Sequence, residues 1–499
     1  MIDTKALREK ILDLAMRGKL VPQDPNDEPA SELLKRIKAE KEELIKQKKI
    51  KRDKNETEIF RGDDGLHYEK FADGTIKEIE VPYELPDGWE WARVRNIARI
   101  ISGGTPKTSI PEYYGEGLPW ITPAEMGKKQ QKVLFEYPEK QITSLGLQKS
   151  SAQIVPEYSI VYSKRAPIGH INIVPFKYST NQGCLSFVPI LVDSSFYYYE
   201  IKNITNDIKT RASGTTFKEI SATAFADTLV VLPPLKEQKR INKELIVKYE
   251  YIDQIDSNQK QLQKLATQLK QKVLDIAMQG KLVPQDPNDE PASVLLEKIR
   301  AEKQRLYEEG KIKKKDLVET EIVKDGDNAY YGKLPKTWIK SKLFSVANVI
   351  MGQSPKGNNV TSEFSLNAVE FHQGKSDFGE KFLNPSGKYT SQITKEIEIP
   401  SIVMSVRAPV GDVNLTRKTI VIGRGLAAIQ PYGYSLEYLY HFLLTQKSIL
   451  EQQATGTTFK AIGGEVLRNL PIALPAEKEQ IRIVNLINSV FEVESQLMK

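Results

Sequence analysis

An internal duplication constrains this chain more than any other feature. Residues 7–31 read LREKILDLAMRGKLVPQDPNDEPAS and residues 269–293 read LKQKVLDIAMQGKLVPQDPNDEPAS, so 20 of 25 positions are identical at an offset of 262. Self-similarity of this kind is the signature of one structural plan used twice, and it has to be recognised before other patterns are interpreted. We therefore expect two halves with the same architecture.

Shorter matches continue the duplication along the chain. Four pairs of segments correspond: SGGTPK (102–107) with MGQSPK (351–356), KRAPIGHINI (164–173) with VRAPVGDVNL (406–415), SGTTFKEI (213–220) with TGTTFKAI (455–462), and LPPLKEQKRI (232–241) with LPAEKEQIRI (474–483). The sequences between these segments differ strongly. One framework is therefore expected to carry two different surfaces.

A long helix is predicted between the halves, because residues 235–279, between Pro234 and Gly280, include neither Pro nor Gly. Its apolar residues recur with the alternating spacing of a coiled coil. The chain ends repeat parts of this stretch and are predicted to pack against it. This predicts an antiparallel pair of long helices, one central and one formed by the termini, with these seam residues: Ile241, Leu245, Ile252, Ile255, Leu262, Leu269, Val273, Ile483, Ile487, Val490 and Leu497. The alternative is a long helix docked on one domain.

The fold class is predicted as α+β, with two mixed α/β domains in a pseudo-twofold arrangement separated by the helix pair. Short β-rich runs punctuated by Gly, Pro and Asn support this class. The expected segments are a helical region with a charged arm (1–85), a first variable domain (86–233), the central helix with a second arm (234–334), a second variable domain (335–474) and a closing helix (475–499). Asp27 and Asp289 are candidate helix caps for the arms. Each arm is interpreted either as a solvated helix or as a docking site for a partner.

Composition and missing motifs argue against catalysis in this chain. A single cysteine, Cys184, excludes a disulfide framework, and the four histidines lack metal-ligand spacing, so no metal site is expected. No phosphate-binding loop, zinc-protease motif or nucleophile elbow is present. No apolar stretch is long enough to span a membrane, so a cytoplasmic location is expected. We predict no catalytic residues and no cofactor in the chain.

The formal net charge of +7 permits polyanion binding, but the positions of the cations matter more. Cations within the segments that recur in both halves are candidates for phosphate contacts: Lys107, Lys164, Arg165, Lys218, Lys356, Arg407 and Lys460. Polar and aromatic residues of the divergent loops are candidates for base reading: Tyr113, Tyr114, Lys128, Lys129, Gln130, Asn181, Gln182, Asn358, Asn359, His372, Gln373, Lys375 and Arg424. The alternative for each is a solvated or structural residue.

Taken together and in this order, the duplicated GKLVPQDPNDEPAS segment, the LPDGW and LPKTW segments, the TTFK pairs and the LPP and LPA exits resemble the specificity subunit of type I restriction-modification systems. The resemblance covers essentially the whole chain. It implies that each variable domain is a target recognition domain reading one half of a split, asymmetric DNA sequence. The helix pair then sets the distance between the two half-sites.

The resemblance also implies the partners. Two adenine-N6 methyltransferase subunits would dock on the helices and two restriction subunits would complete the complex. S-adenosylmethionine would belong to the methyltransferase, which also extrudes the target base, and ATP with Mg²⁺ to the restriction subunit. Two other functions remain open: a protein-interaction adaptor built on a coiled coil, and a stand-alone modification enzyme, which the missing donor-binding motifs disfavour.

Overall fold

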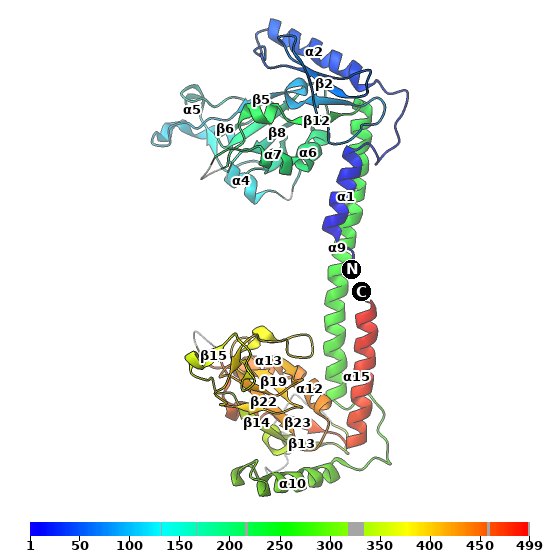
Figure 1. Ribbon diagram of the computed structural model, residues 1–499, viewed down its shortest axis with the longest axis vertical. Coiled ribbons are helices and arrows are strands. Elements are labelled where there is room, and N and C mark those ends of the chain that lie inside the picture. The colour runs from blue at the N-terminus through cyan, green and yellow to red at the C-terminus, as the bar shows by residue number, and fades with distance from the viewer. Residues whose placement is uncertain (131, 166, 215–217, 318–333, 457–459, 498–499) are drawn as a thin grey trace. The chain divides into compact units, whose positions relative to one another are not determined.

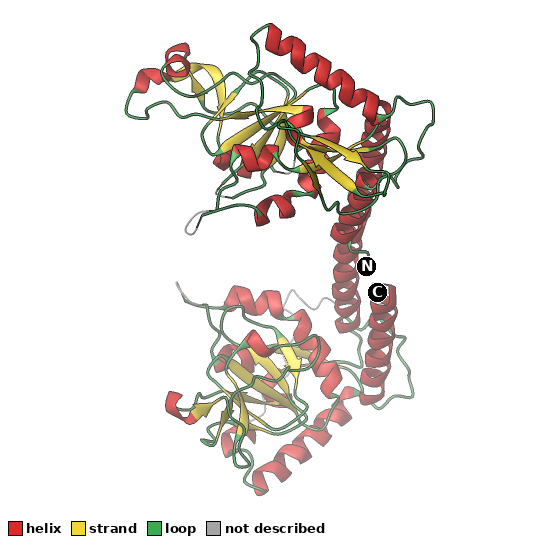
Figure 2. Ribbon diagram, turned by 45° about the horizontal axis from the view of Figure 1, so that its top comes forward, coloured by secondary structure: helices red, strands yellow, loops and turns green. Residues whose placement is uncertain are grey.

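The computed structural model divides into two compact units, Ile2–Asn258 (the N-terminal unit) and Gln259–Lys499 with Met1 (the C-terminal unit). The structure describes all residues except 131, 166, 215–217, 318–333, 457–459 and 498–499. A helix of 44 residues, α9 (Leu235–Met278), contributes to both units. Each unit combines sheets with surrounding helices (Figure 2), which confirms the predicted α+β class. The twofold relation and the domain boundaries stay predictions.

The N-terminal unit is built around a four-stranded antiparallel sheet with the order β5-β11-β8-β9. A three-stranded sheet β10-β6-β7, the pair β12-β4 and a meander β1-β2-β3 complete it. Its strands are β1 (Glu58–Arg61), β2 (His67–Lys70), β3 (Ile76–Glu78), β4 (Glu90–Arg93), β5 (Ala98–Ser102), β6 (Tyr114–Ile121), β7 (Gln141–Ile142), β8 (Ser159–Ser163), β9 (Ile171–Val174), β10 (Ser179–Thr180), β11 (Cys184–Pro189) and β12 (Leu229–Leu232). Besides α9, its α-helices are α1 (Thr4–Met16), α2 (Ala30–Lys46), α3 (Val94–Ile97), α4 (Pro123–Lys128), α5 (Ser144–Gln148), α6 (Ser194–Asn203), α7 (Thr205–Thr210) and α8 (Ala222–Ala226).

The C-terminal unit contains the equivalent four-stranded sheet, β14-β22-β19-β20, the pair β13-β23 and a five-stranded sheet β15-β17-β16-β21-β18. Its strands are β13 (Ile339–Lys342), β14 (Ala347–Met351), β15 (Val360–Thr361), β16 (Val369–His372), β17 (Tyr389–Thr390), β18 (Glu396–Ile397), β19 (Ile402–Ser405), β20 (Val413–Leu415), β21 (Ile420–Ile422), β22 (Leu426–Pro431) and β23 (Pro471–Leu474). Its α-helices are α10 (Ala292–Glu308), α11 (Leu343–Val346), α12 (Leu436–Thr445), α13 (Lys447–Gln453), α14 (Gly464–Arg468) and α15 (Glu477–Leu497).

Strand register shows that the duplication extends to the hydrogen-bond ladders. Leu185 lies opposite Ser102 in the N-terminal unit, and Ala427 lies opposite Met351 in the C-terminal unit. These pairs are related by the offsets of 242 and 249 that align the RAP and G-x-[TS]-P segments in the sequence. The expectation of one architecture used twice is thereby confirmed within each sheet.

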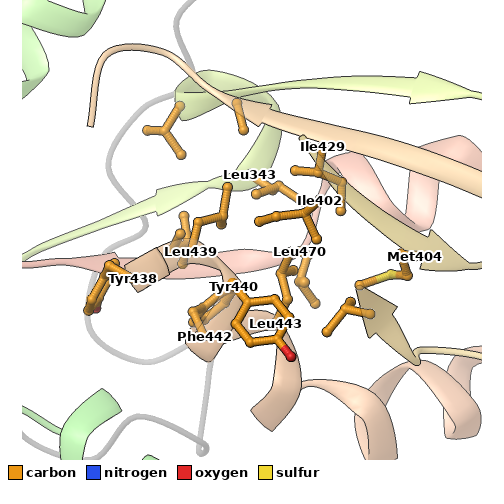
Figure 3. Packing of buried hydrophobic residues seen from close by; sticks show 14 of the residues in the cluster. Leu343, Ile402, Met404, Ile429, Tyr438, Leu439, Tyr440, Phe442, Leu443 and Leu470 are labelled. Atoms are coloured by element: carbon orange, nitrogen blue, oxygen red, sulfur yellow. The ribbon is translucent and has the colours of Figure 1, made fainter. Parts of the chain in front are cut away.

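The core of the C-terminal unit lies between the four-stranded sheet and α12 (Figure 3). Ile402 and Ile429 from the sheet and Phe442 from α12 are fully buried there. Tyr438 is also buried, and its hydroxyl donates a 2.7 Å hydrogen bond to the carbonyl of Ala473. Burial of apolar side chains is the main term that stabilises such a core, and the buried hydroxyl keeps a partner.

The helix pairs are antiparallel, as predicted. In the N-terminal unit, Thr4 contacts Asp256 and Arg8 contacts Asp253, so rising numbers in α1 meet falling numbers in α9. In the C-terminal unit, Lys270 of α9 forms a 2.8 Å ion pair with Glu494 near the end of α15. Figure 1 shows α1 alongside the first part of α9 and α15 alongside its last part.

Several predicted seam residues are exposed, which corrects the expectation of a continuous buried seam. Leu262, Leu269 and Leu497 are 44%, 48% and 74% exposed, and they line an open apolar groove between α9 and α15. The groove is open because, in this part of α9, the buried residues are Ala266 and the predicted seam residue Val273, whereas Leu262 and Leu269 are exposed. The remaining predicted seam residues are buried or half-buried: Ile241, Leu245, Ile252, Ile255, Ile483, Ile487 and Val490.

The GKLVPQDPNDEPAS segment takes part in the same hydrogen-bond clamp in both units. Gln23 and the indole of Trp89 both donate to the carboxylate of Glu237 in α9, at 3.2 and 3.0 Å. Asp27 pairs with Arg240 at 2.6 Å. The corresponding residues of the C-terminal unit, Gln285, Trp338, Glu479, Asp289 and Arg482, make the same contacts.

The clamp corrects the prediction that Asp27 and Asp289 cap the arm helices. The N-cap positions of α2 and α10 are Pro29 and Pro291, and neither helix has a side-chain cap. The two aspartates are instead bound by arginines of α9 and α15.

A second correction concerns residues 58–78, which form the β1-β2-β3 meander although the region 1–85 was expected to be helical.

The arm helices α2 and α10 each bury one face in their own unit. Leu33 and Ile37 of α2 belong to the N-terminal core, and Leu295 and Ile299 of α10 belong to the C-terminal core. Their opposite faces are exposed, so the possibility that they dock a partner stays open. In the part of the chain that the structure describes, no helix has the length and apolar character needed to cross a membrane.

Candidate nucleic-acid interface

The repeated RAP segments form matching tight turns after β8 and β19. In the N-terminal unit, the Ser163 hydroxyl donates to the carbonyl of Pro167 and accepts from the amide of His170. Ser405 makes the same two hydrogen bonds with Pro409 and Asp412. These contacts fix the turn that carries the predicted phosphate ligands Arg165 and Arg407.

In the C-terminal unit, four predicted residues meet in one pocket of about 210 Å³. Arg407 comes from the repeated turn, whereas Gln373, Lys375 and Arg424 come from the divergent loops. Ser354 completes the polar lining. The structure thus brings together a cation shared by both halves and side chains that only this half possesses.

Glycines hold the pocket loops close together. A Cβ atom on Gly352 would lie 2.2 Å from the carbonyl oxygen of Gly423, and one on Gly425 would lie 2.4 Å from that of Gln373. Both distances are far shorter than ordinary van der Waals contacts. The Ser354 hydroxyl also accepts a 3.2 Å hydrogen bond from the amide of Arg424. The backbone at the pocket is therefore closely packed, as a preorganised site requires.

The charges of the pocket are only partly balanced. Lys375 and Lys447 both pair with Asp412, at 2.5 and 2.7 Å. Burial alone would raise the pKa of Asp412, but the hydrogen bonds from the two lysines lower it overall, so the carboxylate is charged at neutral pH. Arg407 and Arg424 are exposed, and among the described residues neither guanidinium has an ion pair or a side-chain hydrogen bond.

In the N-terminal unit, the cations at the matching turn share one internal carboxylate. The carboxylate of Glu219 forms an ion pair with Lys164 at 2.7 Å and a second ion pair with Arg165 at 3.3 Å. The hydrogen bond from Lys164 lowers the pKa of this carboxyl group. Isolated β-bridges join Arg165 to Glu219 and Arg407 to Ala461, so alanine stands where the other half has the glutamate.

The remaining predicted phosphate ligands have exposed side chains: Lys107, Lys218, Lys356 and Lys460. The backbone carbonyl of Lys460 accepts from the amide of Ala408 at 2.9 Å, which places Lys460 beside the RAP turn of its unit. Their roles in DNA binding stay predictions.

Among the base-reading candidates of the N-terminal unit, several make internal contacts, and their base-reading role stays a prediction. The hydroxyl of Tyr114 donates to the carbonyl of Pro106 at 2.7 Å, and the side-chain amide of Gln130 donates to the carbonyl of Met126 in α4 at 2.9 Å. The ammonium of Lys129 donates to the carbonyls of Glu136 and Tyr137.

The other N-terminal candidates differ in exposure. Lys128 and Gln182 are exposed, and Tyr113 and Asn181 are half-buried. The Asn181 side chain accepts a 3.0 Å hydrogen bond from the amide of Gly183, so it stabilises its own turn. Lys128 and Gln182 therefore stay predicted base readers with accessible side chains.

In the C-terminal unit, His372 is buried and cannot reach a base edge, which corrects that assignment. Its side chain is 1% exposed, and its Nδ1 lies 3.1 Å from a carboxylate oxygen of Asp377. Burial is the main reason that its pKa is lowered.

Asn359 donates to the side chain of Gln392 at 2.8 Å, whereas Asn358 is exposed.

The family assignment rests on a match that covers more than half of the chain. The family described as "Type I restriction modification DNA specificity domain" matches residues 86–267 and 335–499, one segment in each half. The chain belongs to this family.

Two curated relatives named as type I specificity subunits align with long stretches of this chain. The EcoEI specificity subunit of a type I restriction enzyme from Escherichia coli is 27% identical over 99% of this chain and 90% of its own length. The EcoAI specificity subunit from Escherichia coli is 32% identical over 72% of this chain and 65% of its own length.

Solved structures of the type I system share the fold. The HsdS subunit from Thermoanaerobacter tengcongensis has a TM-score of 0.54 and 23% identity, covering 84% of this chain and 93% of its own. A chain from a study of assembly and conformational transition of the type I R-M system has a TM-score of 0.57 and 24% identity, with the same coverage.

Two residues of the type I specificity chain escaped the sequence interpretation. Ser354 was passed over although Thr105 occupies the matching place in the other half, which was an available signal. The pairing of Glu219 with Lys164 and Arg165 was also missed, although the sequence shows Glu219 in one TTFK segment and Ala461 at the matching position of the other.

Among the described residues, no group of three or more His, Cys, Asp or Glu side chains could hold a metal ion.

Proposed function

We propose that this chain reads DNA sequence for a type I restriction-modification enzyme, with each unit recognising one half of a split, asymmetric target. The pocket of the C-terminal unit carries this proposal. There Arg407, which recurs in both halves, lies beside Gln373, which does not. Shared cations suit the phosphate backbone, which all DNA has in common, and differing side chains suit sequence-dependent contacts.

In this proposal the chain performs no chemistry of its own. Two methyltransferase subunits would supply adenine-N6 methylation with S-adenosylmethionine, and two restriction subunits would supply ATP- and Mg²⁺-dependent cleavage. The helices α1, α9 and α15 would hold the methyltransferase subunits, and the complex would act in the cytoplasm. Membership of the specificity family and the relatives' names support this assignment.

The test is to produce the chain with the products of its neighbouring genes and to map methylated adenines in host DNA. We expect a bipartite motif with unlike halves, methylated at an adenine in each half. Footprinting of the purified complex should protect the same sequence. Absence of both methylation and protection would favour a protein-interaction adaptor instead.

Exchange of recognition loops tests the division of labour between the units. Replacing residues 107–212 by the equivalent segment of another specificity subunit should alter only one half of the methylated motif. The matched exchange in the C-terminal unit, residues 356–454, should alter only the other half. If either exchange altered both halves of the motif, independent reading by the two units would be wrong.

A further inference from the structure

We propose that the pocket lined by Ser354, Gln373, Lys375, Arg407 and Arg424 binds one phosphodiester group of DNA, and that this open site has no equivalent among the described residues of the N-terminal unit. This inference rests on the proposed DNA-reading function. It assigns Arg424 and Lys375 to the phosphate backbone, although their place in divergent loops had suggested base reading.

The charge of the pocket favours an anion over a neutral base. Lys375 and Lys447 share the single carboxylate of Asp412, so this group keeps one positive charge in excess. The guanidinium groups of Arg407 and Arg424 line the same small volume without a carboxylate partner among the described residues. Like charges at close range repel one another, and an anion bound between them offsets this repulsion by attracting both.

The chemistry of the lining matches a phosphate group. Arginine forms two parallel hydrogen bonds to phosphate oxygens and is the common residue at such sites. The Ser354 hydroxyl accepts from the amide of Arg424 with one of its lone pairs, and its hydrogen can donate to a ligand oxygen. The volume of about 210 Å³ admits a phosphodiester group and its bridging oxygens.

The N-terminal unit offers a natural comparison within the same chain. Its arginine at the matching turn, Arg165, is held by Glu219, and the position matching Arg424 is the uncharged Gln182. Ala461 replaces the glutamate in the C-terminal unit, so Arg407 is accessible. Among the described residues, the turn whose arginine has no carboxylate partner therefore belongs to one half, and the two halves should contribute unequally to salt-dependent binding.

The experiment measures duplex binding by the reconstituted complex as a function of salt, for wild type, Arg424→Ala, Arg424→Lys and Arg407→Ala. We expect each alanine variant to weaken binding to the target and to an unrelated duplex by the same factor. The slope of log affinity against log salt should fall by about one unit for each variant. Arg424→Lys should keep most of the slope, because it retains the charge.

A neutral methylphosphonate placed at each backbone position of the target in turn identifies the phosphate. At the phosphate that the pocket binds, the neutral linkage should weaken binding by the wild type but should not weaken binding by Arg424→Ala any further. Lys478→Ala, an exposed cation at the start of α15, serves as the charge-matched control and should behave as wild type. Unchanged thermal melting of each variant confirms that the fold is intact.

Two results would overturn the phosphate assignment while leaving the proposed function in place. In the first, Arg424→Ala relaxes the preference at one base pair and leaves the salt slope unchanged, which makes Arg424 a base reader. In the second, both alanine variants bind as wild type. If the wild-type complex bound no duplex at all, the proposed function itself would fail.

Discussion

The indole nitrogen of Trp89 donates a 3.0 Å hydrogen bond to the buried carboxylate of Glu237, which joins the first variable region to the long helix α9. Trp338 makes the same bond, also at 3.0 Å, to Glu479 of α15. Burial is the main cause of the raised pKa of both carboxyl groups, so each depends on its donors to remain charged. The clamp is a structural element that both halves share.

Trp89→Phe should destabilise the N-terminal unit, because it removes the indole donor and keeps an aromatic ring. A hydrogen bond to a charged group contributes about 1.5–3 kcal/mol, and the free energy of unfolding should fall by about that amount. Urea denaturation measures the change. Trp338→Phe should cost a similar amount in the C-terminal unit, and a loss below about 0.5 kcal/mol in both variants, the level of ordinary surface substitutions, would contradict the role of the clamp.

Glu219→Ala should strengthen binding to unrelated duplexes, because it frees Lys164 and Arg165 from their internal partner. The salt slope should become steeper by about one unit for each phosphate newly contacted. The reciprocal change, Ala461→Glu, should reduce the slope by placing a carboxylate beside Arg407. Equal slopes for wild type and both variants would show that these turns do not face DNA.

Glu200 should make stability depend on pH. It is fully buried, and burial raises its pKa to about 8 from the ordinary 4.5. Because the folded state favours the protonated form, its contribution to stability is fully present below about pH 4.5 and is lost as pH rises through about 8. Each unit of pKa difference corresponds to about 1.4 kcal/mol.

Glu200→Gln should remove this pH dependence. The amide oxygen can still accept from the amide of Val231, which now lies 3.4 Å from the carboxylate. The variant should gain stability over wild type at pH 8 and show little difference at pH 5, as measured by chemical denaturation at each pH. Glu250→Gln, at an exposed position of α9, is the control and should follow the wild-type profile. Parallel profiles for Glu200→Gln and wild type would refute the buried acid.

Leu245→Ala and Leu262→Ala should differ in cost although both change the predicted seam of α9. Leu245 is fully buried in the N-terminal core, and its truncation should cost about 2–5 kcal/mol. Leu262 is 44% exposed in the groove, so its truncation should cost less than about 1 kcal/mol in the isolated chain. Denaturant unfolding distinguishes them, and equal costs would mean that the groove is closed in solution.

Repetition was the part of the fold that could be predicted with the most detail. The offsets of 242 and 249 that align the RAP and G-x-[TS]-P segments also relate the strand registers of the two central sheets. The antiparallel helix pairs followed from the permuted match of the termini to α9. The meander at residues 58–78 was missed because its short strands lie directly after a strongly charged helical pattern.

The candidate site was predicted only in part. Arg407, Gln373, Lys375 and Arg424 were singled out by recurrence or by their place in divergent loops, and the structure gathers them in one pocket. The same criteria also selected His372, which is buried, and Lys129, which is used internally. Residue type and loop position do not indicate whether a side chain points outward, because that depends on contacts made by distant segments.

The sequence by itself determined that one architecture is used twice around a long helix, because duplicated segments with the same apolar pattern must bury equivalent surfaces. Only the tertiary structure decided which cations are available to a ligand. Arg165 and Arg407 occupy the same turn in their units, yet Glu219 pairs with one and Ala461 stands beside the other. An ion pair requires two atoms within a few ångströms, and residues more than 50 positions apart in the chain reach that distance only through folding.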